Sequence, residues 1–367
     1  IKEGDVLKQG AYTTLSVKVT YSNSVTSQPT NLDASLTVTL DFVQSDGSSG
    51  DIGGDTSNTA AAMLKAKVVT SGDGLYTDST EAGRYVYRGA NPNNYITLGT
   101  DTYRIIAIES DSTLKVIKNG SIGIKVFDPG YSTSITGVTG SNSTDGTRYS
   151  STSTDYCYYS YSASSYYGCK VWGSKTTTLD TNGKNVTQMP REVDGTLYNL
   201  PDAEATLNTY LNNDWYNSLS SNVQNIVVSH MFNVGVTKYN ETNLSNTISQ
   251  EKAYKWKGKV GLINPSDYVK ASTNSACDSV NAYRSNSSCY NSSETHNWIY
   301  AEPMAKNYSW TIVPYDGSVS RVFFVRSGGE VDSTVALSNF GVASVLYLSS
   351  DISLEGDGTS NSPYTVG

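Results

Sequence analysis

The sequence lacks the features that mark several large classes of protein. No basic cluster exceeds two adjacent cations, and the net charge is -8 at pH 7, so the chain offers no surface that would release counterions from nucleic acid. No apolar run approaches the roughly eighteen residues that a membrane-spanning helix needs. We therefore predict no nucleic-acid partner and no membrane span in this chain.

Residues that commonly carry catalysis are also scarce. His230 and His296 are the only histidines, and no Gly-x-Ser-x-Gly motif surrounds a serine. The sequence NIVVSHMF predicts a partly buried, structural His230, and the polar run NSSETHNW predicts a surface position for His296. Asp194, Asp202 and Asp316 are available as acids, but no spacing selects a pair. We predict a non-catalytic protein without a cofactor; an enzyme of unknown type is the remaining alternative.

Four cysteines are present, and they form two pairs of identical spacing, Cys157 with Cys169 and Cys277 with Cys289. The intervening loops, CYYSYSASSYYGC and CDSVNAYRSNSSC, are too polar to form a core, so we predict a local disulfide in each, contributing about 3 kcal/mol. Zinc is the competing interpretation, but Cys-x2-Cys spacing is missing, and we predict no metal. Disulfides indicate an extracellular or cell-surface location. Because the chain begins with Ile1, we expect export followed by removal of a signal.

The composition favours an exterior surface rich in tyrosine. Charged residues make up 16% of the chain, hydrophobic residues 37%, and there are 28 tyrosines. Tyrosine combines a large apolar ring with a polar tip, so it suits ligand contacts, although packing in a strand-rich fold explains it equally well. The candidate ligand contacts are Tyr158, Tyr159, Tyr166, Tyr167, Trp172, Trp298, Trp310 and Tyr315.

The sequence of residues 1–46 predicts an incomplete module of β-strands. Residues 12–21 and 35–43 alternate apolar with polar residues, which predicts half-buried strands. Two or three strands are marginally stable alone, so we expect an upstream domain, the following domain or another subunit to complete them. Another copy of the chain, joined by strand addition, is the preferred partner. The assembly residues would be Leu15, Val17, Val19, Leu36, Val38, Leu40 and Phe42.

The predicted organisation has three segments. Residues 1–46 form the strand module, residues 47–71 a Gly/Ser/Asp-rich linker with a short helix, and residues 72–367 an α+β domain. A low-complexity insertion occupies residues 130–200.

Within the α+β domain, several elements are predicted from local patterns. Residues 102–109 and 113–118 predict a hairpin with one buried face. Helices are expected from Pro201, across 249–259 and across 264–272, and a short strand across 259–263, while the C-terminal third returns to strands.

Several stretches carry a resemblance to known sequences, among them GLYTDSTEAGRYVYRGANPNNYITLGTDTYRIIAIE, KWKGKVGLINPSDYVKA and GVASVLYLSSDISLEGDGTSNSPY. Residues 72–367 resemble an uncharacterised domain of exported proteins from Gram-positive gut bacteria, which is distantly similar to the C-type-lectin-like and formylglycine-generating-enzyme folds. The resemblance implies a lectin-like mixed domain with long disulfide-stapled loops. Calcium-dependent sugar binding is disfavoured, because Met304 follows Glu302-Pro303 where the lectin signature has an amide oxygen.

Residues 5–46 are similar to the last strands of jelly-roll fibre subunits of Gram-positive biofilms. That similarity implies a β-sandwich and strand exchange between neighbouring subunits. We therefore expect a structural or adhesive surface protein, such as a pilus-like or fibre subunit. The alternative is an adhesin that binds a glycan or a host surface protein.

Overall fold

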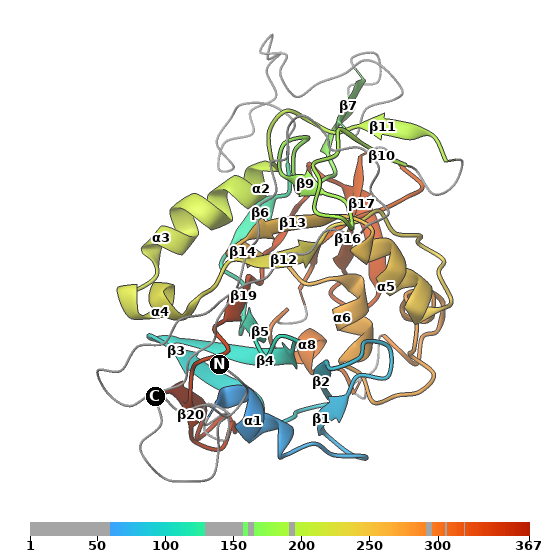
Figure 1. Ribbon diagram of the computed structural model, residues 1–367. Coiled ribbons are helices and arrows are strands. Elements are labelled where there is room, and N and C mark those ends of the chain that lie inside the picture. Colours follow the sequence, from blue (N-terminus) through green and yellow to red (C-terminus); the bar gives the residue numbers. More distant parts are fainter. Residues whose placement is uncertain are drawn as a thin grey trace, which may run out of the picture. The chain divides into compact units, whose positions relative to one another are not determined.

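A computed structural model (Figure 1) describes residues 59–128, 157–160, 165–190, 195–290, 296–304, 307–318 and 320–367, without the side chains of 157–160 and 165–167. The chain divides into two units, Ile1–Ser57 and Asn58–Gly367, and every described residue belongs to the second. The predicted assembly strands therefore lie outside the described residues, as does much of the predicted insertion. The described part is a mixed fold of helices and strands, mostly strands, in several sheets.

The helices are short, and most begin at a polar capping residue. Thr59 and Asn243 accept backbone N–H groups at the starts of α1 and α5, and Asn264 and Asp267 form a reciprocal capping box at α6. In the described residues the helices are α1 Ala60–Lys65, α2 Thr206–Thr209, the π-helix η3 Tyr210–Trp215, α3 Tyr216–Ser218, α4 Ser221–Ile226, α5 Leu244–Lys252, α6 Pro265–Lys270, α7 Ala282–Ser285 and α8 Trp298–Ala301.

The largest sheet of the described residues is built around the predicted hairpin, which the structure confirms as β4 and β5 in antiparallel register. The predicted single buried face is wrong, because residues 103–108 of β4 are all buried, so both faces of this strand are covered. The strand order is β14 Val260–Gly261, β19 Val345–Leu348, β5 Leu114–Lys118, β4 Asp101–Ile108, β3 Tyr95–Leu98, β21 Tyr364–Val366 and β20 Leu354–Glu355, with β2 Tyr85–Arg88 paired to β4 and β1 Gly74–Thr77 paired to β2.

A second sheet supplies one wall of the candidate site described below. Its order is β17 Val331–Val335, β16 Arg321–Val325, β15 Ser309–Pro314, β18 Asn339–Gly341 and β6 Ile124–Val126. The remaining described strands form a three-stranded sheet, β12 His230–Asn233, β13 Lys255–Gly258 and β9 Thr178–Leu179, and two ribbons, β10 Gln188–Pro190 with β11 Leu197–Asn199 and β7 Cys157–Ser160 with β8 Ser165–Cys169. In the view of Figure 1, α2 and α3 lie on one side of β12–β14, and α5 and α6 on the other.

Two predicted helices need correction. The helix expected from Pro201 begins at Thr206, after an extended Ala205. Residues 255–258, expected to continue a helix, form β13 instead. Trp256 is buried against Phe232 while the lysines on either side of it are more exposed, so the alternation of a strand overrides the helical propensity of the lysines.

No helix among the described residues is both long and apolar enough to cross a membrane.

Candidate functional site

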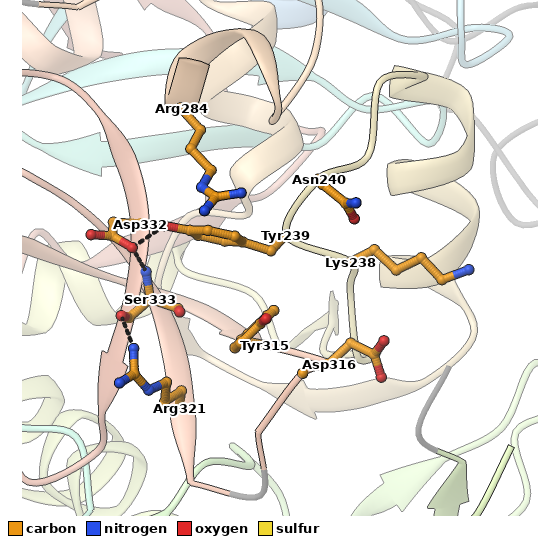
Figure 2. Close-up of a pocket in the computed structure, with 10 residues that line it drawn as sticks. Lys238, Tyr239, Asn240, Arg284, Tyr315, Asp316, Arg321, Asp332 and Ser333 are labelled. Carbon is orange, nitrogen blue, oxygen red and sulfur yellow. Dashed lines mark hydrogen bonds between the residues drawn. The ribbon is translucent and has the colours of Figure 1, made fainter. Parts of the chain in front are cut away.

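A cleft of about 570 Å³ opens between the loop after β12, helix α7 and the second sheet. This volume falls within the roughly 300–1,000 Å³ that is usual for small-molecule sites. We call it the Tyr239–Tyr315 cleft. It is lined by Lys238, Tyr239, Asn240, Arg284, Tyr315, Asp316, Gly317, Arg321, Asp332 and Ser333 (Figure 2).

The two tyrosines that give the cleft its name come from loops that are joined to each other by backbone hydrogen bonds. The N–H of Thr237 donates to Pro314 O at 3.1 Å, and the N–H of Asp316 donates to Thr237 O at 2.9 Å. The rings of Tyr239 and Tyr315 are therefore neighbours, with centroids 5.2 Å apart. Buried Phe323 of β16 packs against both rings from below the cleft. The tyrosines consequently have a fixed, half-buried position rather than a freely moving one.

A buried lysine holds the turn that follows Tyr315. The ammonium group of Lys170 donates to the carbonyl of Tyr315 at 2.7 Å and also to the carbonyl of Ser318. At Gly317, an added Cβ would lie 2.1 Å from the hydroxyl oxygen of Tyr315, so the Tyr315 ring folds back over a residue that has no side chain. Lys170 directly follows Cys169, which is buried and disulfide-bonded.

Asp332 is the best-satisfied charge of the cleft. Its carboxylate accepts hydrogen bonds from the Tyr239 hydroxyl, from Arg326 Nε at 2.7 Å and from the N–H of Ser333 at 2.7 Å. Burial opposes ionisation, but these donors and the Arg326 charge outweigh it and lower the pKa of Asp332. For Tyr239, burial and the hydrogen bond to Asp332 raise the pKa to about 12. Asp332 is thus an anion, and Tyr239 a neutral donor, throughout the physiological pH range.

The second predicted disulfide is confirmed, and it carries a residue of the cleft. Cys277 and Cys289 are bonded with a Cα–Cα distance of 5.4 Å, and both are fully buried. Their loop contains α7, from which Arg284 extends over the Tyr239 ring, with its guanidinium carbon 3.7 Å from the ring centre. For the first predicted disulfide, the β7–β8 ribbon places the backbone of Cys157 opposite Cys169.

The predicted ligand contacts separate into three groups. Tyr315 lines the cleft. The predicted role of Trp172, Trp298 and Trp310 is wrong, because their side chains are at most 1% exposed. Trp298 and Trp310 donate their indole N–H groups to backbone carbonyls, and Trp172 packs on Phe127, so these rings build the core. The side chains of the remaining four, Tyr158, Tyr159, Tyr166 and Tyr167, lie outside the described set.

Sequence reasoning missed most of the cleft. Tyr239, Arg284, Arg321 and Asp332 come from four separate segments and share no motif, so only the tertiary structure brings them together. One signal was available: Arg284 is the single cation inside the otherwise polar loop between Cys277 and Cys289.

A second cluster of charged residues is buried in the core. Asp267 accepts hydrogen bonds from Arg84 at 2.8 Å and Lys115 at 2.7 Å. Asp78 accepts hydrogen bonds from Arg84 at 3.0 Å and Lys270 at 2.7 Å. The cluster joins the connection between β1 and β2 to β5 and α6, so its role is structural.

Glu251 of α5 lies beside this cluster. It accepts hydrogen bonds from the N–H of Ser266 at 3.0 Å and from the Ser266 hydroxyl. Burial, together with the negative charge of Asp267, raises the pKa of Glu251 to about 8. At neutral pH its carboxyl group is therefore mainly protonated.

His230 and Glu302 have local partners, and His296 is exposed, as predicted. His230 stacks on Tyr347 with centroids 3.9 Å apart, and its Nε2 lies 3.1 Å from Asp111 Oδ2, which agrees with the predicted partly buried, satisfied histidine. Glu302 pairs with buried Arg104 at 3.2 Å. Within the described residues, no group of three or more His, Cys, Asp or Glu side chains is arranged to hold a metal ion.

Comparison with known proteins gives no match: no family model, no curated protein and no solved structure is similar to this chain.

Proposed function

We propose that the protein is an exported, non-catalytic adhesive surface protein that binds a carbohydrate in the Tyr239–Tyr315 cleft. The observation that carries the proposal is the pairing, in one cleft, of two fixed tyrosine rings with amide, carboxylate and guanidinium groups. A sugar ring has apolar C–H faces and a rim of hydroxyl groups. Aromatic faces beside oriented polar groups match both features.

The preorganisation of the cleft supports ligand binding. The Tyr239 hydroxyl donates to Asp332, and Arg284 stacks on the Tyr239 ring. The backbone carbonyl of Tyr315 accepts a hydrogen bond from Lys170. Fixed side chains lose little conformational entropy when a ligand binds. Neither histidine lines the cleft, so the residue that most often serves as general base is missing there.

The other parts of the proposed function rest on the sequence analysis. A lectin-like identity for the domain, an extracellular location and adhesion to a glycan or host surface are parts of the same proposal, and disulfide bonding supports the location. Assembly into a fibre through strand addition stays a prediction about residues 1–46. Loss of filaments in negative-stain images when that segment is deleted would support it, and unchanged filaments would contradict it.

The binding proposal is tested with the full chain on a glycan array, followed by calorimetry with the best glycan. Tyr315→Ala is expected to weaken binding at least tenfold, because it removes one aromatic face. Gly317→Ala should weaken binding as well, since the new methyl group would displace the Tyr315 ring.

The matched control is Tyr76→Ala. Tyr76 is a half-buried tyrosine of β1 that also carries a stacked arginine, Arg88, but it does not line the cleft. Full affinity in this control, with reduced affinity in the two cleft variants, is the expected result. An empty array, or equal loss in all three variants, would overturn the proposal.

A further inference from the structure

The charges of the cleft are unevenly satisfied. Lys238, Arg284 and Arg321 are its cations, and Asp316 and Asp332 its carboxylates. Both carboxylates are buried, with exposed fractions of 1% and 8%. Asp332 already has three donors, including Arg326 from outside the cleft. The carboxylate of Asp332 is therefore turned inward and bound to the protein.

The two arginines are in the opposite situation. Both are exposed, and in the described part of the chain neither forms an ion pair with a carboxylate. Arg284 is stacked on Tyr239, and Arg321 donates from Nη1 to the carbonyl of Ser333 at 3.2 Å. A guanidinium has five N–H donors, so most of the donors in each group are left for a ligand.

Three of the other four described arginines are arranged differently, whereas Arg88 also lacks a carboxylate partner among the described residues. Arg84, Arg104 and Arg326 each pair with at least one carboxylate. In a chain with a net charge of -8, carboxylates are plentiful, yet the two cleft arginines are left without one. Figure 2 shows their guanidinium groups on opposite sides of the Tyr239, Asp332 and Ser333 group. Both arginines line the cleft, so an anionic group that enters it can meet either guanidinium group.

We infer that the cleft selects saccharides that carry an anionic group, a carboxylate as in uronic acids or a sulfate ester, with Arg284 and Arg321 as the residues that determine this specificity. The inference rests on the proposed carbohydrate function. A planar guanidinium matches a carboxylate through two parallel hydrogen bonds. Arg284 uses its face and a hydrogen bond for Tyr239, and its remaining edge donors are left for the sugar.

The experiment measures the affinity of the full chain for matched ligands by calorimetry. The probes are a glucuronate-containing oligosaccharide, the same oligosaccharide with its carboxyl groups reduced to alcohols, and a sulfated counterpart of that neutral form. We expect the glucuronate form to bind at least tenfold more tightly than the neutral form. Higher salt should reduce this preference. Sulfate binding as tight as glucuronate binding would support the shared anion chemistry, and weaker sulfate binding would assign the site to carboxylates.

Arg284→Gln and Arg321→Gln are each expected to lower the preference for the acidic form over the neutral form at least fivefold. Arg284→Lys should restore only part of the preference, because an ammonium group keeps the charge but not the planar fork. The control is Arg88→Gln, since Arg88 is also stacked on a tyrosine and also donates to a backbone carbonyl, but lies outside the cleft.

The outcomes distinguish this inference from the function on which it rests. Equal binding of acidic and neutral forms overturns the inference and leaves carbohydrate binding intact. A preference that survives both arginine variants also overturns it. Binding of none of the three probes, with an empty glycan array, overturns the carbohydrate function itself.

Discussion

The guanidinium carbon of Arg284 lies 3.7 Å from the ring centre of Tyr239. The hydroxyl group at the other end of the same tyrosine is hydrogen-bonded to Asp332. The face and the tip of the ring are thus fixed by two segments that are far apart in the sequence, a disulfide loop and the strand β17. The pKa of Tyr239 should therefore change when either contact is altered.

Tyr239 is expected to keep its proton well beyond the usual range, with a pKa of about 12. Burial contributes most and the hydrogen bond to Asp332 next, so Asp332→Asn should lower the pKa of Tyr239 without returning it fully to 10. NMR of ring-labelled tyrosine would measure it, with the signal assigned by Tyr239→Phe. Glu330→Gln is the control, because it removes a partner of Arg326 and leaves the bond to Tyr239 in place. An unchanged pKa in Asp332→Asn would contradict the hydrogen bond.

The disulfide loop should matter both for stability and for the ligand. Replacing Cys277 and Cys289 together by serine is expected to lower the free energy of unfolding by about 3 kcal/mol. It should also weaken binding of acidic glycans, because Arg284 depends on this loop. Urea denaturation and calorimetry measure the two effects. Full affinity of the folded double variant for an acidic glycan would show that Arg284 is positioned without the bridge.

Local sequence patterns predicted the elements that depend mainly on neighbouring residues in the sequence. The hairpin of β4 and β5, the start of α6 at Pro265 and the Cys277–Cys289 bridge are confirmed. The sequence did not distinguish a tyrosine at a cleft from a tryptophan in the core. Trp310 and Tyr315 are five positions apart, yet one is buried and the other lines the cleft, because the strand β15 ends between them. Burial of this kind depends on tertiary contacts that no local pattern encodes.

Removing a charge from the buried cluster around Asp267 should lower the free energy of unfolding more than removing an exposed charge. Asp267→Asn leaves Arg84 and Lys115 in the core with a partner lost, and we expect a loss of about 3–5 kcal/mol. The matched control is Asp101→Asn, which removes a partner of Lys118 from a pair whose Asp101 side chain is 47% exposed. That change should cost at most about 1 kcal/mol. Equal effects on the midpoint of urea denaturation would contradict the structural role of the cluster.

Two sets of buried carboxyl groups determine how stability depends on pH, and they act in opposite directions. The pKa of Asp78 is lowered to about 2, because the positive charges of Lys270 and Arg84 outweigh its burial, and the pKa of Asp267 is lowered too. These groups stabilise the fold above their usual pKa of 3.8. That stabilisation is lost as the pH falls through their folded-state values.

Glu251 acts at higher pH and with the opposite sign. Between its usual pKa of 4.5 and its folded-state value of about 8, the folded chain keeps a proton that the unfolded chain has released. The free energy of unfolding therefore falls as the pH rises through this window, at up to about 1.4 kcal/mol per pH unit, and this contribution is constant above it. We expect the melting temperature to be highest near pH 4.5 to 5 and to fall toward pH 8.

Glu251→Gln isolates this contribution, because glutamine resembles the protonated carboxyl group in shape and still accepts a hydrogen bond from Ser266. The variant should flatten the fall in melting temperature between pH 5 and pH 8, whereas Glu330→Gln, at a partly exposed site, should keep the fall seen in the unaltered chain. An undiminished slope in Glu251→Gln would mean that another group releases the proton. Because α5 also holds the cleft loop through the hydrogen bond from the Lys238 N–H to Gln250, the same titration should be repeated with the glycan bound. A ligand that requires an intact α5 would then show its affinity falling as the pH rises past the folded-state pKa of Glu251, about 8.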